Sequence, residues 1–215
     1  MHFLLCARML CTLHSKKQII NIPLSPSGSL STGEGGGRGL ILIKMDLIPS
    51  FAVDHTNLQP GIYVSRQDEV NGAVITTYDI RMTAPNHEPC LNPAAIHTIE
   101  HLVATYLRNL DGWKEKIIYW GPMGCLTGNY LILKGSYPCE EIRDLMIGAF
   151  QYVVDYDDVV PGTTAATCGN YLMHDLPMAK YEARRYVKRL KEDFYCEYPG
   201  IVRPEDTNGK VFFDA

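Results

Sequence analysis

The sequence predicts an α+β fold, a two-layer sandwich in which a mainly antiparallel sheet carries helices on one face. Two β-rich runs are joined by Asn71-Gly72, a dipeptide typical of a tight hairpin turn. Three later segments repeat apolar residues at helical spacing, and further β-rich runs lie between the first two of them. The open sheet face or edges of such a fold need a cover, and a second subunit of a homodimer is one.

The first elements have clear boundaries in the sequence. We expect the hairpin over residues 62–70 and 73–82. The first helix should begin after Asn92, whose side chain can cap it, with Pro93 in the first helical position. It should end at Asp111-Gly112.

The later elements follow in order. Residues 116–120 and 126–134 are expected as strands, Pro138 opens a second helix, and a third follows Asp175. The apolar stripe of the second helix comprises Ile142, Leu145, Met146, Ala149, Phe150 and Val153. The inward face of the third comprises Ala179, Ala183, Val187 and Leu190.

Composition limits the class of protein. At 215 residues, with 46% hydrophobic and 20% charged residues, the chain suits one domain. A net charge of −4 gives no basic footprint for nucleic acid, and no apolar run approaches the length of about 20 residues that a membrane span needs. The seven cysteines are odd in number and form no C-x-x-C pair, which indicates a reducing compartment such as the cytoplasm.

Residues 1–44 differ from the rest. Residues 25–39 are rich in Ser, Gly and Pro and cannot bury enough apolar surface to fold, so we expect disorder there. The Gly/Glu/Arg run before Met45 looks like a translated ribosome-binding region, and we hypothesise that Met45 is the native initiator. The single domain would then span residues 45–215. A native peptide map containing residues before Met45 would contradict this.

The segment His97-Thr98-Ile99-Glu100-His101 predicts a metal site. On a helix, residues at i and i+4 lie about 5–6 Å apart on one face, so both imidazoles can share one cation, with Glu100 beside them as a base. The alternative is that both histidines cap polar groups in the core or face water. A closed structural zinc site, or a metal-dependent interaction protein, is a further alternative.

A catalytic metal usually takes three protein ligands and keeps one open position. Cys168 is the best third candidate, because it lies in a small-residue loop with little packing value, whereas Cys139 and Cys196 lie at or near helix ends. The motif also matches the H-x-x-E-H signature of zinc metallopeptidases, which is the alternative function. That signature expects a distant glutamate as third ligand, but the expected position holds Met178.

Cys125 is a second candidate for chemistry. It lies in a glycine-rich turn between two strands, where glycines allow a ligand to approach the backbone. A small buried thiol is the equally weighted structural alternative.

Five segments together closely resemble S-ribosylhomocysteine lyase, the LuxS family, in the family's order across residues 45–215. These segments are residues 51–56, 78–86, 97–101, 121–128 and 168–169. The resemblance implies a homodimer with two metal sites at the subunit interface. It also implies cleavage of S-ribosylhomocysteine to homocysteine and 4,5-dihydroxy-2,3-pentanedione, the precursor of autoinducer-2, by carbonyl migration and β-elimination.

The resemblance also implies roles for individual residues. His97, His101 and Cys168 match the ligands of one divalent metal per subunit, Fe(II) or Zn. Glu100 and Cys125 match the two acid/base residues. The positions matching substrate contacts are Ser50, His55, Arg81 and Arg108, of which the first three are expected to complete the pocket of the other subunit. Many members have an acidic residue where this chain has Tyr119-Trp120-Gly121.

Overall fold

The computed structural model describes residues 52–201. The expectations for residues 1–44, for Met45 as initiator and for Ser50 lie outside this range.

The four described strands form one antiparallel sheet in the order β1-β2-β4-β3. Their bounds are β1 (Gly61–Val70), β2 (Ala73–Arg81), β3 (Ile117–Pro122) and β4 (Gly128–Lys134). The predicted hairpin is confirmed. Asn71 and Gly72 have φ angles of 52° and 78°, the left-handed values that a type I′ turn requires.

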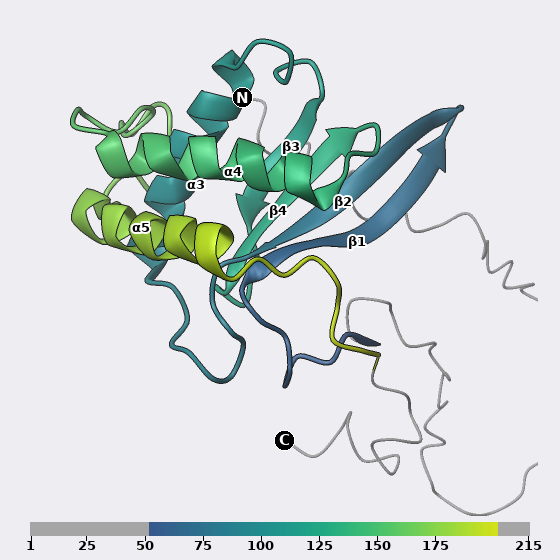
Figure 1. The fold of residues 1–215 in the computed structure, drawn as a ribbon. Helices are drawn as coiled ribbons and strands as arrows, with labels where there is room; N and C mark the ends of the chain where they lie inside the picture. Colours follow the sequence, from purple (N-terminus) through teal and green to yellow (C-terminus); the bar gives the residue numbers. More distant parts are fainter. Residues whose placement is uncertain (1–51, 202–215) are drawn as a thin grey trace, which may run out of the picture. The chain divides into compact units, whose positions relative to one another are not determined.

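Three long helices cover one face of this sheet, as Figure 1 shows, so the predicted α+β class is confirmed. They are α3 (Pro93–Asn109), α4 (Cys139–Asp155) and α5 (Leu176–Glu192). Asn92 caps α3 by accepting hydrogen bonds from the N–H groups of residues 94 and 95. Asp175 caps α5, because its side chain accepts a hydrogen bond from the N–H group of residue 178.

The core lies between the helices and the sheet. Every residue of the predicted stripes on α4 and α5 is buried. From the sheet, Ile62, Ile80 and Leu131 are fully buried in the same cluster. Among the described residues, no helix is long and apolar enough to cross a membrane.

Two strand boundaries differ from the prediction. β3 continues through Gly121 to Pro122, and β4 begins at Gly128 instead of residue 126. The reason is that Leu126 has a φ of 57°, which bends the chain into a turn and ends the extended conformation there. Cys125 therefore lies in a longer turn than expected.

The other face of the sheet is partly covered by the chain itself. Side chains alternate along a strand, so Tyr63, Asp79 and Arg81 point away from the helices, yet each is buried. Tyr198 stacks on Tyr63 with 4.7 Å between ring centroids, and the Ile62 N–H donates to the carbonyl of residue 195 at 2.9 Å. This cover creates a buried polar environment around Arg81.

Candidate metal centre

His97 and His101 lie one turn apart on α3, and each ring is held by a backbone carbonyl. His97 Nδ1 donates to the carbonyl oxygen of Met173 at 2.8 Å, and His101 Nδ1 donates to that of Pro161 at 2.7 Å. An imidazole that donates from Nδ1 and is neutral keeps its Nε2 lone pair free. Both rings are thus prepared to bind a cation through Nε2.

Cys168 completes a ligand set. Its Sγ lies 3.4 Å from His97 Nε2 and 3.9 Å from His101 Nε2. Tetrahedral zinc, with bonds of about 2.0–2.1 Å to nitrogen and 2.3 Å to sulfur, places such atoms about 3.6 Å apart. The two imidazole planes are 88° apart, so one ion can lie in both. The predicted three ligands are therefore brought together in a geometry that fits a divalent metal.

The loop around Cys168 holds the sulfur in place. The Cys168 N–H donates to the carbonyl of Thr164 at 3.0 Å, and the N–H of Asn170 points at Sγ from 3.4 Å. These two hydrogen bonds fix the position of the Cys168 sulfur beside the two histidines.

His174 is a fourth member of this cluster that the sequence analysis missed. One ligand atom from each of His97, His101, Cys168 and His174 lies within 4.8 Å of the others. Burial and the neighbouring His97 and His101 lower the pKa of His174 to about 4, so its ring is neutral near pH 7. The only sequence signal is its position six residues after Cys168, a spacing that matches no motif considered above.

Glu100 is half-buried on the same helix, three residues after His97. Burial raises the pKa of its carboxyl group from the ordinary value, and the nearby His97 and His101 oppose this shift. A carboxyl group in such a position can exchange protons with a neighbouring molecule.

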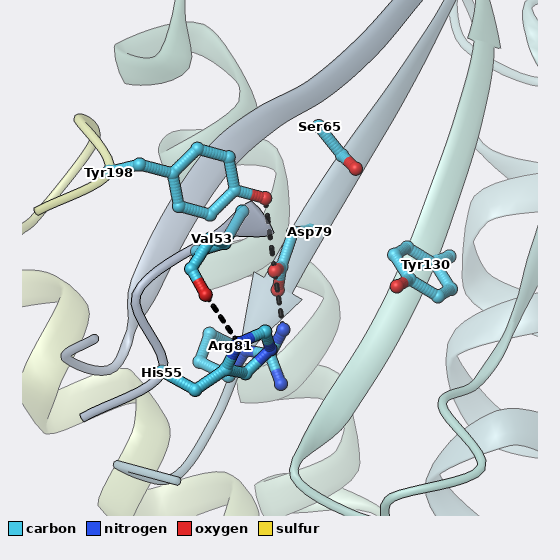
Figure 2. Close-up of a pocket in the computed structure, with 7 residues that line it drawn as sticks. All are labelled: Val53, His55, Ser65, Asp79, Arg81, Tyr130 and Tyr198. Carbon is cyan, nitrogen blue, oxygen red and sulfur yellow. Dashed lines mark hydrogen bonds and ion pairs between the residues drawn. The ribbon is translucent and has the colours of Figure 1, made fainter. Parts of the chain in front are cut away.

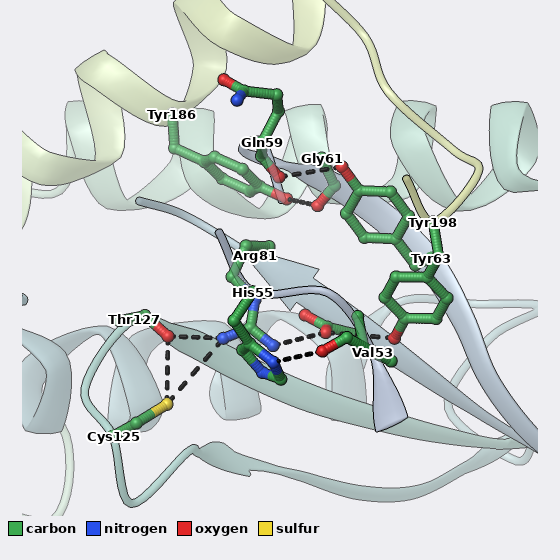
Figure 3. Close-up of polar contacts among 11 residues, drawn as sticks. Val53, His55, Gln59, Gly61, Tyr63, Arg81, Cys125, Thr127, Tyr186 and Tyr198 are labelled. Carbon is green, nitrogen blue, oxygen red and sulfur yellow. Dashed lines mark hydrogen bonds and ion pairs between the residues drawn. The ribbon is translucent and has the colours of Figure 1, made fainter. Parts of the chain in front are cut away.

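Cys125 lies in a second polar group, shown in Figure 3. Its Sγ is 3.0 Å from the hydroxyl oxygen of Thr127 and 3.8 Å from Arg81 Nη1. Arg81 also donates to the Thr127 hydroxyl at 2.5 Å. The exposed thiol therefore lies beside a fixed positive charge. We call Asp79, Arg81, Cys125 and Thr127 the arginine group.

The turn that carries Cys125 is tied to the start of α3. The carbonyl of Leu126 accepts the N–H of Leu91, the residue before the Asn92 cap, at 2.8 Å. The N–H groups of Met82 and Thr83 donate to the carbonyl of Thr127. Left-handed φ values cost a residue such as Leu126 of the order of 1–3 kcal/mol, so these bonds hold the turn in an unfavourable conformation.

Arg81 is anchored by a buried ion pair. Its Nη2 lies 2.6 Å from Asp79 Oδ2, and both side chains are at most 4% exposed. Burial raises the pKa of the Asp79 carboxyl group, whereas the Arg81 charge opposes that shift. The Tyr198 hydroxyl donates to the same carboxylate oxygen at 3.1 Å.

His55 faces this pair across a small cavity, shown in Figure 2. His55 Nδ1 donates to the carbonyl of Val53 at 2.8 Å. The cavity is lined by Val53, His55, Ser65, Asp79, Arg81, Tyr130 and Tyr198. Its volume of about 30 Å³ has room for about two water molecules, which is small for a sugar derivative.

The remaining predicted positions lie apart from these groups. Arg108 is exposed in the last turn of α3, and its Nη2 is 3.5 Å from the carbonyl of Ile118. The end of the Tyr119 phenol ring lies where a Cβ on residue 121 would be, so the Tyr119 side chain would have to shift if residue 121 were not glycine. The departure over residues 119–121 is therefore a mutually adapted pair, and Trp120 between them is buried in the core.

The structure thus separates the predicted residues into two sets. His97, His101 and Cys168 form the candidate metal centre, and Glu100 is on the same helix as the two histidines. His55, Arg81 and Cys125 lie together on the sheet side. Among the hydrogen bonds and ion pairs described for residues 52–201, none joins a residue of one set to a residue of the other.

The group of His97, His101 and Cys168 on this α+β scaffold could hold a metal ion, as the centres of metal enzymes do. The family model of S-ribosylhomocysteinase (LuxS) matches residues 48–195. The chain belongs to this family.

Known relatives agree with this assignment. The chain is 57% identical over 148 residues to the S-ribosylhomocysteine lyase of Phocaeicola vulgatus, covering 69% of this chain and 92% of the relative. The lyase of Porphyromonas gingivalis is 53% identical over 146 residues (68% and 92%), and that of Borreliella afzelii is 51% identical over 146 residues (68% and 93%).

The metallopeptidase alternative is not supported. The acid nearest to the expected third-ligand position, Glu182, lies 2.8 Å from Arg185 in an ion pair on α5, outside the ligand cluster. The H-x-x-E-H motif lies inside the region that matches the S-ribosylhomocysteinase family instead.

Proposed function

We propose that this chain cleaves S-ribosylhomocysteine to homocysteine and 4,5-dihydroxy-2,3-pentanedione, the precursor of autoinducer-2. The observation that supports it most is the open centre of His97, His101 and Cys168 in a member of the S-ribosylhomocysteinase family. The reaction recycles the remnant of methyl transfer and releases a signalling precursor. It consumes neither water nor an electron acceptor, because the atoms of the substrate are divided between the two products.

The chemistry requires movement of a carbonyl group along the ribose chain, followed by loss of the homocysteine thiolate. When bound, the metal polarises the carbonyl oxygen and makes the neighbouring C–H group more acidic. Glu100 and Cys125 are the two residues we assign to take and return protons. Arg81 and Thr127 hold the Cys125 sulfur in place, with the guanidinium group 3.8 Å and the hydroxyl oxygen 3.0 Å from it.

Four residues are proposed to bind substrate: Ser50, His55, Arg81 and Arg108. The ion pair with Asp79 fixes the Arg81 guanidinium group, and His55 lines the same cavity. Arg108 is 7 residues after His101, close to two helical turns, so it lies on the same face of α3, about 10 Å along the axis. An exposed guanidinium group at that distance suits the carboxylate of the homocysteine part.

The centre is proposed to hold one divalent metal per subunit, Fe(II) or Zn. Two imidazole nitrogens and one thiolate accept either ion, and local availability decides between them. Elemental analysis after anaerobic purification identifies the metal and its stoichiometry.

The proposed reaction is tested by thiol release. Anaerobically purified protein is mixed with S-ribosylhomocysteine, and the new thiol is followed with a thiol reagent. Release that depends on added metal supports the lyase. Cleavage of a denatured protein substrate without thiol release would favour a peptidase, and metal-dependent folding with neither activity would favour a structural protein.

We further propose that the active enzyme is a homodimer with shared sites. The cavity beside Arg81 is small for the substrate, which supports a larger pocket completed by a second subunit. Val159 and Leu172 are 77% and 79% exposed. Val159 lies two residues before Pro161, whose carbonyl holds His101. Leu172 lies one residue before Met173, whose carbonyl holds His97. Large exposed apolar side chains beside a metal centre suit a subunit interface.

Complementation tests the shared pocket. Arg81→Ala keeps the metal centre and Cys168→Ala keeps the arginine group, so each variant alone should be inactive. If subunits exchange and the pocket is shared, one site of each heterodimer contains both intact halves, and activity returns. Confirmed exchange without activity would place the whole site within one subunit.

Cytoplasmic location is also proposed, because the five cysteines of the described residues are all free thiols.

A further inference from the structure

His174 is part of the cluster but has no role in the proposed reaction. Its ring stacks on that of His97, with 4.1 Å between centroids and 25° between planes. An imidazole binds an ion in the plane of its own ring. Two rings stacked face to face cannot both meet one ion in this way, so His174 is not a fourth ligand beside His97 in this arrangement.

The hydrogen bonds of Thr98 determine which nitrogen of His174 carries its proton. Thr98 Oγ1 donates to the carbonyl of Ala94 at 2.8 Å and accepts the N–H of Asp175 at 3.0 Å. It also lies 3.2 Å from His174 Nδ1. A hydroxyl group has one proton, which Ala94 already receives, so His174 Nδ1 must be the donor.

This assignment leaves a lone pair on His174 Nε2. That nitrogen is buried and has no hydrogen-bond partner among the described residues. A buried acceptor without a partner is unfavourable. A cation held by His97, His101 and Cys168 would compensate for it, because the lone-pair end of a neutral imidazole attracts positive charge, whereas an N–H group in its place would repel it.

We propose that His174 is a positioning residue of the metal centre, which fixes the ring plane of His97 by stacking and, held as one tautomer by Thr98, keeps an unprotonated Nε2 instead of an N–H group beside the bound cation. This inference rests on the metal centre of the proposed function. It concerns affinity for the ion, so it can be tested without turnover.

The first test is Co(II) binding to His174→Phe, measured by competition with a chelator. Phenylalanine keeps a flat ring against His97 but has no lone pair. The dissociation constant for Co(II) should rise roughly 10- to 100-fold, as it does when partners behind metal ligands are removed. The visible absorption band of the bound Co(II) should keep its shape, because the three ligands remain. His174→Asn, which also loses the stacked ring, should weaken binding at least as much and change the band.

The second test removes only the Thr98 hydroxyl group, which fixes the tautomer of His174. Thr98→Val removes the hydroxyl group at nearly constant volume, and Co(II) binding should weaken several-fold. Thr105→Val is the matched control, because Thr105 makes the same kind of bond on the same helix, to the carbonyl of His101 at 2.8 Å. It should bind Co(II) like the unmodified protein.

The outcomes separate the possible failures. A folded His174→Phe protein with unchanged Co(II) affinity overturns the role of the lone pair. Equal Co(II) affinity in Thr98→Val and Thr105→Val overturns the role of Thr98 in fixing the tautomer of His174. If the unmodified protein binds no Co(II), the metal centre of the proposed function fails, and this inference fails with it.

Discussion

The metal centre and the arginine group hold their polar side chains in opposite ways. In the metal centre, backbone carbonyls fix the Nδ1 side of both imidazoles, and each Nε2 is left to face the ligand cluster. In the arginine group, Asp79 pairs with the charge of Arg81, and the Thr127 hydroxyl accepts a further hydrogen bond from it. A region that must accept an ion keeps its acceptors unpaired, whereas a region that must keep a permanent charge pairs it before any ligand arrives.

The largest expected effect comes from removing a metal ligand. Replacing His97, His101 or Cys168 with Ala should abolish bound metal and thiol release together, because the remaining two ligands hold the ion too weakly. Elemental analysis and the thiol assay are read on the same sample. Stoichiometric metal in Cys168→Ala would show that another group is the third ligand, and Cys125 and Cys139 would be tested next.

The next effect separates ligation from proton transfer. Cys125→Ala and Glu100→Gln should each keep the metal but lose about 10²- to 10⁴-fold in turnover, the usual contribution of a proton-transfer group. One residue lies in the arginine group and the other on α3, so both regions should prove necessary. Near-normal turnover of Cys125→Ala would make this thiol a packing residue.

A stability effect should distinguish the arginine group. Asp79→Ala leaves the Arg81 charge buried without its partner and should lower the free energy of unfolding by roughly 3–5 kcal/mol. The control is Asp111→Ala, because Asp111 pairs with Lys114 but is 92% exposed and should change stability by less than about 1 kcal/mol. Urea unfolding of both variants gives the comparison. Equal losses would contradict the buried charge pair.

The sequence predicts the two regions unequally. Helical spacing identifies His97 and His101, because i and i+4 positions always share a face. Loop composition indicates Cys168. His174 and Thr98 are 76 residues apart, and only the folded loop brings them together, so no periodic pattern marks them.

The arginine group is hidden for another reason. Asp79 and Arg81 alternate with the apolar Tyr78 and Ile80 along β2, a pattern that suggests a solvent-facing side. The strand is predicted correctly. However, the cover that buries the pair comes from distant segments, including Tyr198, 119 residues after Asp79, and such contacts leave no local trace in the sequence.

The smallest expected effect is in thiol reactivity, which compares the regions directly. Alkylation with iodoacetamide at about pH 8 should be slowed several-fold at Cys168 when zinc is added, because a ligating thiolate is no longer free to react. Cys125 should react at the same rate with and without zinc. Peptide mapping by mass spectrometry measures both thiols in one sample.

Cys139 is the internal reference for that measurement. Burial, with a smaller contribution from Cys196 and Glu140, raises its pKa to about 11. Because the thiolate is the reactive form, only about one Cys139 in a thousand is reactive at pH 8, so it should react slowly with or without zinc. Protection of Cys125 as strong as that of Cys168 would place Cys125 among the ligands, and the separation of the two regions would then be wrong for the metal-loaded protein.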